Sequence, residues 1–230
     1  MTSRVTERRL VAAAFGLLAI VFVALPGIDL WASGLFFHDG QWAFRNANWP
    51  VFELLFRGVP RVGQGLLLAL ALALLLGLFR PFAWLRARRT LFGFLLAGAL
   101  LGPVLLVDAT LKDTMGRARP ITVEAFDGPR RFTPAFVPSD QCPKNCSFVS
   151  GHVATASFVM AFGWLGAPAI RRRWLLASLA TGGLLAVVRL SAGGHFLSDT
   201  VFAWFATYFA LAATEWIFRR LGWLPRRSTA

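Results

Sequence analysis

The sequence carries little charge, although it is rich in hydrophobic residues. Charged residues make up 15% of the chain and hydrophobic residues 57%, whereas a soluble domain carries about 25% charge. The stretch 66–79 contains no charged residue at all. Because such a stretch would aggregate in water, the composition excludes an ordinary soluble domain and indicates a protein that lies in lipid.

Cysteine and acidic residues are also scarce, which argues against two further kinds of site. Cys142 and Cys146 are separated by three residues and have no histidine beside them, so their spacing is not typical of a zinc site. The apolar segments carry few acidic residues, whereas a transporter or channel needs an ionisable pathway through the membrane. Transport is therefore the weaker alternative.

Six apolar segments are each close to the roughly 20 residues that a helix needs to cross a bilayer. They cover residues 10–28, 62–79, 91–111, 153–170, 174–190 and 200–218. The first follows three arginines, as a signal peptide would, but it is long for one and five more segments follow. We therefore expect an all-α membrane protein, a single domain of residues 1–230 with six transmembrane helices.

The net charge of +13 is spread over short arginine clusters. A nucleic-acid-binding protein would gather this charge on one surface, so no nucleic acid partner is expected. The clusters precede the first apolar segment and follow the second, fourth and sixth, as is typical of cytoplasmic loops. We therefore expect both termini in the cytoplasm and two long loops, 29–61 and 112–151, on the outer side.

The two outward loops differ in composition. Residues 29–61 are rich in Phe and Trp, which predicts an amphipathic segment along the membrane surface. Residues 112–151 contain Cys142 and Cys146 and most of the polar residues described next. In an oxidising compartment these cysteines are expected to form a disulfide, and the alternative is two free thiols.

The first polar cluster, residues 112–120, lies at the outer end of the third segment. Lys112, Arg117 and Arg119 are three cations within a short stretch that Pro120 closes. Lysine offers a point charge, and arginine offers a planar fork that matches phosphate oxygens. The cluster therefore predicts a site for a multiply charged anion.

The second cluster, Ser150, Gly151 and His152, lies where the fourth segment begins. The N-terminus of a helix presents unpaired N–H groups and the positive end of its dipole, so it favours phosphate. Ser150 offers a hydroxyl, Gly151 a close backbone approach, and His152 a proton. The alternative is that Ser150 is only a helix N-cap, but that leaves the histidine unexplained.

The third cluster, with Arg189, His195 and Asp199, joins the fifth and sixth segments. His195 and Asp199 are four residues apart, so they share a face on a helical turn. Asp199 is then expected to accept a proton from one ring nitrogen and leave the other free to attack, as in a nucleophile oriented by a carboxylate.

Together the clusters resemble the three motifs of the phosphatidic acid phosphatase type 2 superfamily, K-x6-RP, PSGH and SR-x5-H-x3-D. The matching positions are Lys112, Arg119, Pro120, Ser150, Gly151, His152, Arg189, His195 and Asp199. Val149 and Val188 stand where the family has proline and serine. Loss of the proline removes a preset turn and loss of the serine removes one hydrogen bond, but neither change removes a group that must carry charge or a proton in the reaction. The resemblance covers the chain from the third segment to the sixth.

This resemblance implies a role for each residue of the site. His195 attacks phosphorus and forms a phosphohistidine, Asp199 orients His195, and His152 protonates the leaving oxygen. The groups that hold the phosphoryl oxygens are Lys112, Arg119, Ser150, Gly151 and Arg189. No metal and no cofactor is implied, because these cations supply the charge that a metal would otherwise provide.

The expected substrate is a lipid whose phosphate lies at the outer membrane boundary. The stretch 132–150 looks like the bacterial lipid A phosphatase branch of this superfamily, which implies the inner membrane of a bacterium. Undecaprenyl pyrophosphate and phosphatidylglycerophosphate are the alternative substrates. A vanadium-dependent haloperoxidase has the same anion-binding motifs but is soluble, and a non-catalytic lipid-binding or transport protein is the alternative of a different class.

Overall fold

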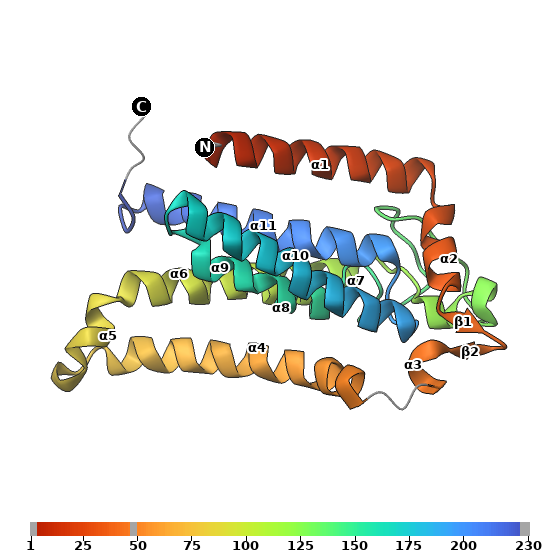
Figure 1. Ribbon diagram of the computed structural model, residues 1–230, viewed down its shortest axis with the longest axis horizontal. Coiled ribbons are helices and arrows are strands. Elements are labelled where there is room, and N and C mark those ends of the chain that lie inside the picture. Colours follow the sequence, from red (N-terminus) through yellow and green to blue (C-terminus); the bar gives the residue numbers. More distant parts are fainter. Residues whose placement is uncertain (1–3, 47–49, 226–230) are drawn as a thin grey trace.

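The computed structural model describes residues 4–46 and 50–225, and these residues are predominantly helical, which confirms the all-α prediction. The long helices are α1 (Arg4–Ala24), α4 (Pro50–Leu76), α10 (Pro168–Ser191) and α11 (Leu197–Arg220). A further continuous helix comprises α6 (Arg89–Ala99), η2 (Leu100–Leu111) and α7 (Lys112–Thr114). These helices run along one direction, and α10, α11 and α6 lie between α1 and α4 (Figure 1).

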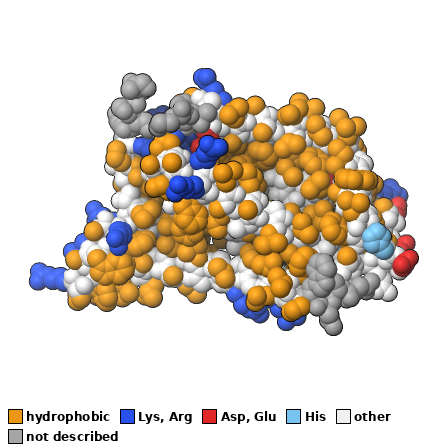
Figure 2. All heavy atoms as spheres, in the orientation of Figure 1, with side chains coloured by type: hydrophobic (Ala, Val, Ile, Leu, Met, Phe, Trp, Pro, Cys, Tyr) orange, Lys and Arg blue, Asp and Glu red, His pale blue; other side chains and the backbone are white. Residues whose placement is uncertain are grey.

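Within the described residues, four helices are long and apolar enough to cross a membrane, or five if the bent pair α1 and α2 counts as one span. The four are Pro50–Leu76, Arg89–Thr114, Pro168–Ser191 and Leu197–Arg220. Hydrophobic side chains cover much of the visible flank of the bundle (Figure 2). Leu68 and Leu72 of α4 are among the exposed ones. Because soluble proteins rarely expose large apolar surfaces, the chain is an all-α membrane protein.

The first predicted segment, 10–28, contains a corner. Helix α1 ends at Ala24, and α2 (Gly27–Gly34) leaves it at an angle of 85°. Pro26 lies at this corner, where it offers no N–H to continue the helix. The bend turns α2 across the end of the bundle (Figure 1), and Asp29 of α2 contacts Arg117 and Ser198.

Other helix boundaries also differ from the predicted ones. Helix α4 begins at Pro50 rather than near residue 62, because residues 50–61 continue the same helix and accommodate Pro60 within it. The fourth segment ends at Trp164 rather than at residue 170. It consists of α8 (Gly151–Ser157), η5 (Phe158–Met160) and α9 (Ala161–Trp164). Pro168 then begins α10, which suits proline in the first turn of a helix.

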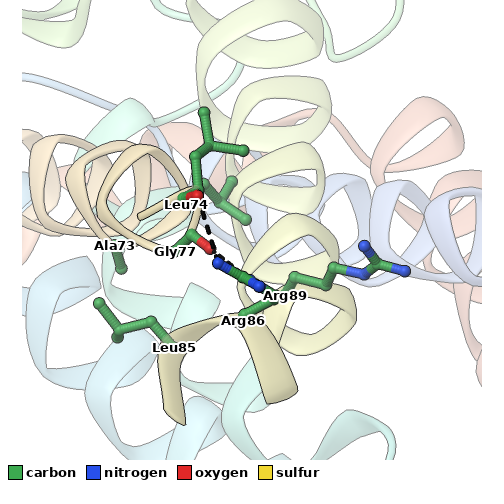
Figure 3. Close-up of a pocket in the computed structure, with 7 residues that line it drawn as sticks. Ala73, Leu74, Gly77, Leu85, Arg86 and Arg89 are labelled. Carbon is green, nitrogen blue, oxygen red and sulfur yellow. Dashed lines mark hydrogen bonds between the residues drawn. The ribbon is translucent and has the colours of Figure 1, made fainter. Parts of the chain in front are cut away.

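A tight connection joins α4 to α6 through η1 (Arg80–Phe82) and α5 (Ala83–Ala87). The guanidinium of Arg86 donates hydrogen bonds to the carbonyl oxygens of Gly77 at 3.0 Å and Leu78 at 3.2 Å (Figure 3). Both carbonyls lie just beyond the last residue of α4, so this side chain holds the turn that leaves the helix.

The irregular parts of the chain gather at the opposite end of the bundle, here called the site end (Figure 1). They comprise α2, β1 (Phe37–His38), β2 (Gln41–Trp42), α3 (Ala43–Asn46), η3 (Pro120–Thr122), η4 (Glu124–Phe126) and the connecting segments up to Ser150. Trp42 is buried there against Phe37 and Phe126. Cys142 and Cys146 form a disulfide in the same region. The end where α1 starts and α11 stops is here called the terminal end.

Candidate active site

His195 lies in the short turn between α10 and α11 and is 1% exposed. Its Nδ1 is 2.7 Å from the carbonyl oxygen of Ser147. A carbonyl oxygen can only accept, so Nδ1 carries the proton and Nε2 carries the lone pair. Burial lowers the pKa of His195 to about 3, and the imidazole is therefore neutral at physiological pH. This is the protonation state that a nucleophile requires.

Asp199 lies close to His195, but the expected direct hydrogen bond is not formed. Its Oδ2 is 3.8 Å from Nδ1 of His195, beyond hydrogen-bonding distance. Oδ2 instead accepts from the Ser147 hydroxyl at 2.5 Å and from the Phe196 N–H at 2.7 Å. His195 precedes the first turn of α11, and Ser147 is hydrogen-bonded to both residues. Ser147 therefore links the carboxylate to the imidazole.

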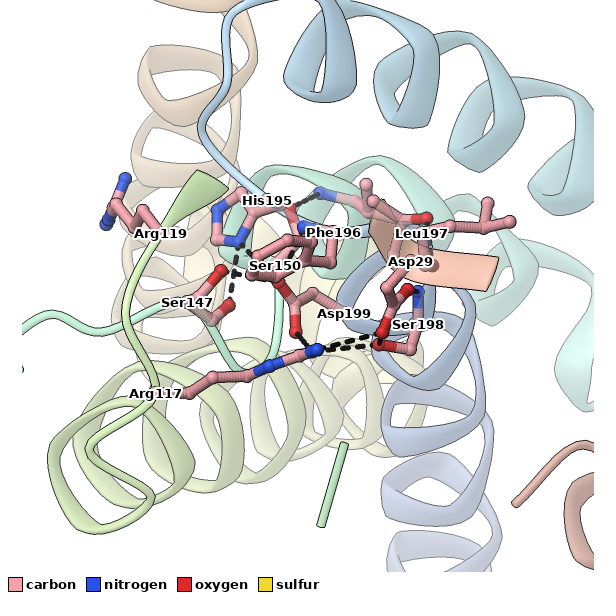
Figure 4. A network of polar contacts seen from close by, with 12 residues as sticks. Asp29, Arg117, Arg119, Ser147, Ser150, His195, Phe196, Leu197, Ser198 and Asp199 are labelled. Carbon is pink, nitrogen blue, oxygen red and sulfur yellow. Dashed lines mark hydrogen bonds and ion pairs between the residues drawn. The ribbon is translucent and has the colours of Figure 1, made fainter. Parts of the chain in front are cut away.

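A buried ionic network lies beneath this pair (Figure 4). The Arg117 guanidinium is 2.6 Å from Oδ1 of Asp199 and 2.8 Å from Oδ2 of Asp29. Ser198 donates to Asp29 through its backbone N–H at 2.8 Å and through its hydroxyl at 2.6 Å. All three charged groups are at most 1% exposed. Two carboxylates around one guanidinium leave a negative balance below His195, which favours positive charge developing on its ring.

Sequence reasoning missed most of this network. Arg117 was recognised as a cation of the first cluster, but it faces inward to two carboxylates. Asp29 comes from the corner after α1, far from the motifs in the sequence. The available signal was a carboxylate beside an apolar segment in a chain with only 11 acidic residues. An acidic group in such a place needs a specific partner.

The second cluster forms the start of α8. Ser150 is the N-cap, and its hydroxyl accepts from the Val153 N–H at 3.5 Å. A side chain at Gly151 would place its Cβ 2.5 Å from Oδ1 of Asp108 and 2.7 Å from Nζ of Lys112. A larger residue would require these two side chains to shift, so the first cluster lies directly against the N-terminus of α8.

Two of the predicted phosphate-binding cations have partners within the protein. Nζ of Lys112 is 2.5 Å from Oδ1 of Asp108, one turn earlier in the same helix. The Arg119 guanidinium donates to Asn145, to its carbonyl oxygen at 2.8 Å and to its side-chain oxygen at 3.0 Å. Most of these partners are neutral or solvent-exposed, and a phosphate dianion would compete well with them.

Arg189 differs from these cations. It is 4% exposed, and its Nε has no hydrogen-bond partner among the described residues. Its guanidinium packs on the backbone of Gly194, where a Cβ would lie only 2.4 Å from it, and over the Phe56 ring at 4.7 Å. In the described part of the chain no carboxylate lies within ion-pair distance of it. A buried cation without a counter-ion is costly, so this position indicates an anion-binding site.

The unpaired cation adjoins the nucleophile. After burial, the charges of Arg189 and Arg119 contribute to lowering the pKa of His195. The Phe56 ring also lies against His152, whose Nε2 is 2.9 Å from the Phe56 carbonyl oxygen. The structure thus brings the residues of all three motifs together at the site end. In the described chain no group of three or more His, Cys, Asp or Glu side chains is arranged to hold a metal ion.

Buried histidine, a carboxylate and several cations at one end of an apolar helical bundle define the class of membrane-embedded phosphate-transfer sites. The PAP2 superfamily matches residues 90–223, and the chain belongs to this superfamily, as the motifs predicted. The matched region leaves out α1, α2 and α4, and with them Asp29 and Phe56.

Curated relatives match over most of the chain. A lipid A 4′-phosphatase of Francisella tularensis subsp. novicida is 34% identical, over 82% of this chain and 85% of the relative. A lipid A 4′-phosphatase of Rhizobium etli is 33% identical, over 85% of this chain and 81% of the relative. A lipid A 4′-phosphatase of Rhizobium leguminosarum is 34% identical, over 85% of this chain and 89% of the relative. No solved structure matches the chain significantly.

Proposed function

We propose that this chain is a lipid phosphatase that removes the 4′-phosphate of lipid A through a phosphohistidine on His195. The observation that carries the proposal is the buried, unpaired Arg189 beside the neutral imidazole of His195. A dianionic phosphate supplies the missing counter-ion and presents its phosphorus to the nucleophile. The relatives, which are named lipid A 4′-phosphatases, support the choice of substrate.

The proposed reaction needs a neutral His195 and a His152 that carries a proton on both ring nitrogens. The Nε2 lone pair of His195 forms a bond to phosphorus while the ester P–O bond breaks. His152 gives a proton to the leaving sugar oxygen. Water then gives a proton to the now neutral His152 and attacks phosphorus, the P–N bond breaks, and inorganic phosphate leaves. The groups proposed to hold the phosphoryl oxygens are Lys112, Arg119, Ser150, Gly151 and Arg189.

The proposed topology has six crossings, with α1 as the first and the run from α8 to α9 as the fourth. Helix α1 starts and α11 stops at the same end of the bundle (Figure 1), as an even number of crossings requires. The arginine clusters favour a cytoplasmic terminal end, which leaves the site end in the periplasm of a bacterial inner membrane.

Thiol labelling tests this orientation. After reduction of the disulfide, a membrane-impermeant thiol reagent should label Cys142 and Cys146 in intact spheroplasts. Labelling that requires broken membranes would place the site in the cytoplasm and reverse the topology.

A phosphate-release assay tests the activity itself. The purified protein in detergent is given lipid A with only the 4′-phosphate, lipid A with only the 1-phosphate, undecaprenyl pyrophosphate or phosphatidylglycerophosphate. We expect fastest release from the first. Preference for another lipid would reassign the substrate, and release from none, equal to a His195→Ala control, would overturn the enzymatic function in favour of lipid binding.

A further inference from the structure

A proline within α4 leaves one backbone acceptor of this helix without its usual donor. In an α-helix the N–H of each residue donates to the carbonyl oxygen four residues earlier. The residue four positions after Phe56 is Pro60, which lies inside α4 and has no N–H. The Phe56 carbonyl oxygen is therefore free of its helical hydrogen bond.

That free carbonyl oxygen is the hydrogen-bond partner of His152. Nε2 of His152 is 2.9 Å from it, and the two rings lie against each other with centroids 5.2 Å apart. Since a carbonyl oxygen only accepts, Nε2 must carry a proton. Nδ1 is then the ring nitrogen that exchanges a proton with the substrate.

Helices α4 and α8 also approach closely one turn after Pro60 and His152, at Gly63 and Thr155. A Cβ at Gly63 would lie 2.7 Å from Cγ2 of Thr155, so glycine lets the two backbones approach. Thr155 lies one turn after His152 in α8. The crossing therefore holds the Phe56 carbonyl and the His152 ring in a defined relative position.

We propose that Pro60 is a positioning residue for proton transfer. By withholding an N–H, it keeps the Phe56 carbonyl available to orient His152, with Nε2–H on the carbonyl and Nδ1 toward the leaving oxygen. In this step His152 starts as an imidazolium with protons on both ring nitrogens; as the ester P–O bond breaks, the Nδ1 proton moves to that oxygen, and the ring becomes neutral and keeps its Nε2 proton. This inference rests on the proposed function, because it assigns His152 as the acid.

Restoring the missing N–H should impair proton donation specifically. In Pro60→Ala the new N–H competes for the Phe56 carbonyl and His152 loses its fixed orientation. Phenyl phosphate and p-nitrophenyl phosphate separate this effect from damage to the fold, because phenolate needs a proton to leave and p-nitrophenolate does not. The quantity measured is the first-turnover rate of phenol or nitrophenol release.

We expect Pro60→Ala to slow phenol release from phenyl phosphate by about 10- to 100-fold, which is part of the rate enhancement that general acid catalysis contributes. Nitrophenol release from p-nitrophenyl phosphate should slow by less than about 3-fold. Pro60→Val, which also restores the N–H but stays closer in volume, should behave alike and serves if Pro60→Ala does not fold. Gly58→Ala is the matched control. It stiffens the same turn, its Cβ meets no atom within 4 Å, and both rates should stay at the wild-type value.

The His152→Ala background shows whether Pro60 acts through His152. In that background Pro60→Ala should cause no further loss of rate, since the effects of substituting coupled residues do not add. Equal losses on both aryl phosphates, an additive loss in the double variant, or no loss at all would overturn the proposal. Failure of every lipid to react would count against the proposed substrate class alone, because the aryl phosphates report the leaving-group step independently.

Discussion

The two ends of the bundle both contain buried arginines, but the arginines have different partners. At the terminal end, Arg171 pairs with Glu7 at 2.6 Å, and Glu215 accepts from Arg8 at 2.7 Å and from Arg219 at 2.8 Å. At the site end, Arg117 lies between Asp29 and Asp199. Arg189 has no carboxylate partner among the described residues.

This difference shows that burial alone does not identify a functional arginine. Arg171 is 1% exposed and Arg189 is 4% exposed. Glu7 binds Arg171 through both carboxylate oxygens, and the Trp164 ring lies 3.7 Å from its guanidinium carbon. The first arginine is satisfied within the protein and ties α1 to α10. The charge of Arg189 is balanced only when an anion binds. The presence or absence of a carboxylate partner therefore distinguishes a structural arginine from one in the active site.

The largest effect is expected from the nucleophile at the site end. His195→Ala should abolish turnover, because loss of a covalent nucleophile commonly costs on the order of 10⁴-fold or more. The variant should retain the wild-type elution profile in detergent. Retention of a tenth of the wild-type phosphate release would show that His195 is not the nucleophile.

Arg189→Met should reduce kcat/KM for phosphate release by roughly 10²- to 10³-fold, as for other groups that stabilise transition-state charge. Its thermal unfolding midpoint should be unchanged or higher, because a buried cation without a partner is removed. A lower midpoint with intact activity would mean that Arg189 is structural after all.

Arg171→Met should show the opposite pattern at the terminal end. It leaves Glu7 without its guanidinium partner, and breaking a buried ion pair costs about 3 kcal/mol of unfolding free energy. Activity per folded molecule should stay at the wild-type value, as measured by titrating active sites before the assay. Lost activity in a fully stable variant would contradict the assignment of this cluster to folding.

Asp29→Asn should lower kcat by about 10-fold, the range expected for removing one neighbouring charge near the reacting group. Arg117 then keeps one carboxylate instead of two, and the negative balance below His195 is lost. KM should change little, since Asp29 does not face the phosphate groups. Asp39→Asn makes the same chemical change at an exposed position nearby and should leave kcat unaltered.

The smallest effect is expected from removing divalent metals. The cations of the site match the charge of a phosphate dianion without a metal, so excess EDTA should leave activity unchanged. Vanadate, which carries a similar charge and can become five-coordinate, should inhibit. Restoration of EDTA-treated enzyme by Mg²⁺ or Zn²⁺ would require His195 and His152 to be reinterpreted as ligands.

Much of the site was predictable because its residues keep fixed spacings within short segments. Lys112 and Arg119, Ser150 to His152, and Arg189 to Asp199 each lie within a short stretch of the chain, so the sequence alone predicts that they lie near one membrane face. Partners from distant segments could not be predicted in this way. Asp29 and the Phe56 carbonyl reach the site from α2 and α4, which the motifs do not include.

The ion pairs of the terminal end could not be predicted from the sequence either. Its arginines were interpreted only as orientation signals, and Glu215 lies in a segment that hydropathy assigns to the membrane. In the structure Glu215 is fully buried among Arg8, Arg219 and Trp164. Which arginine meets which carboxylate depends on helix packing, and hydropathy carries no information on that.

Sequence alone determined the membrane environment, the helical class, the family and the identity of the chemical groups, because these depend on composition and on local spacing. Tertiary structure decided which groups are paired. It placed Ser147 between His195 and Asp199, gave Arg117 two carboxylates, and left Arg189 without one. The energy of a buried charge is set by neighbours within a few ångströms, and helix packing brings those neighbours from all parts of the chain.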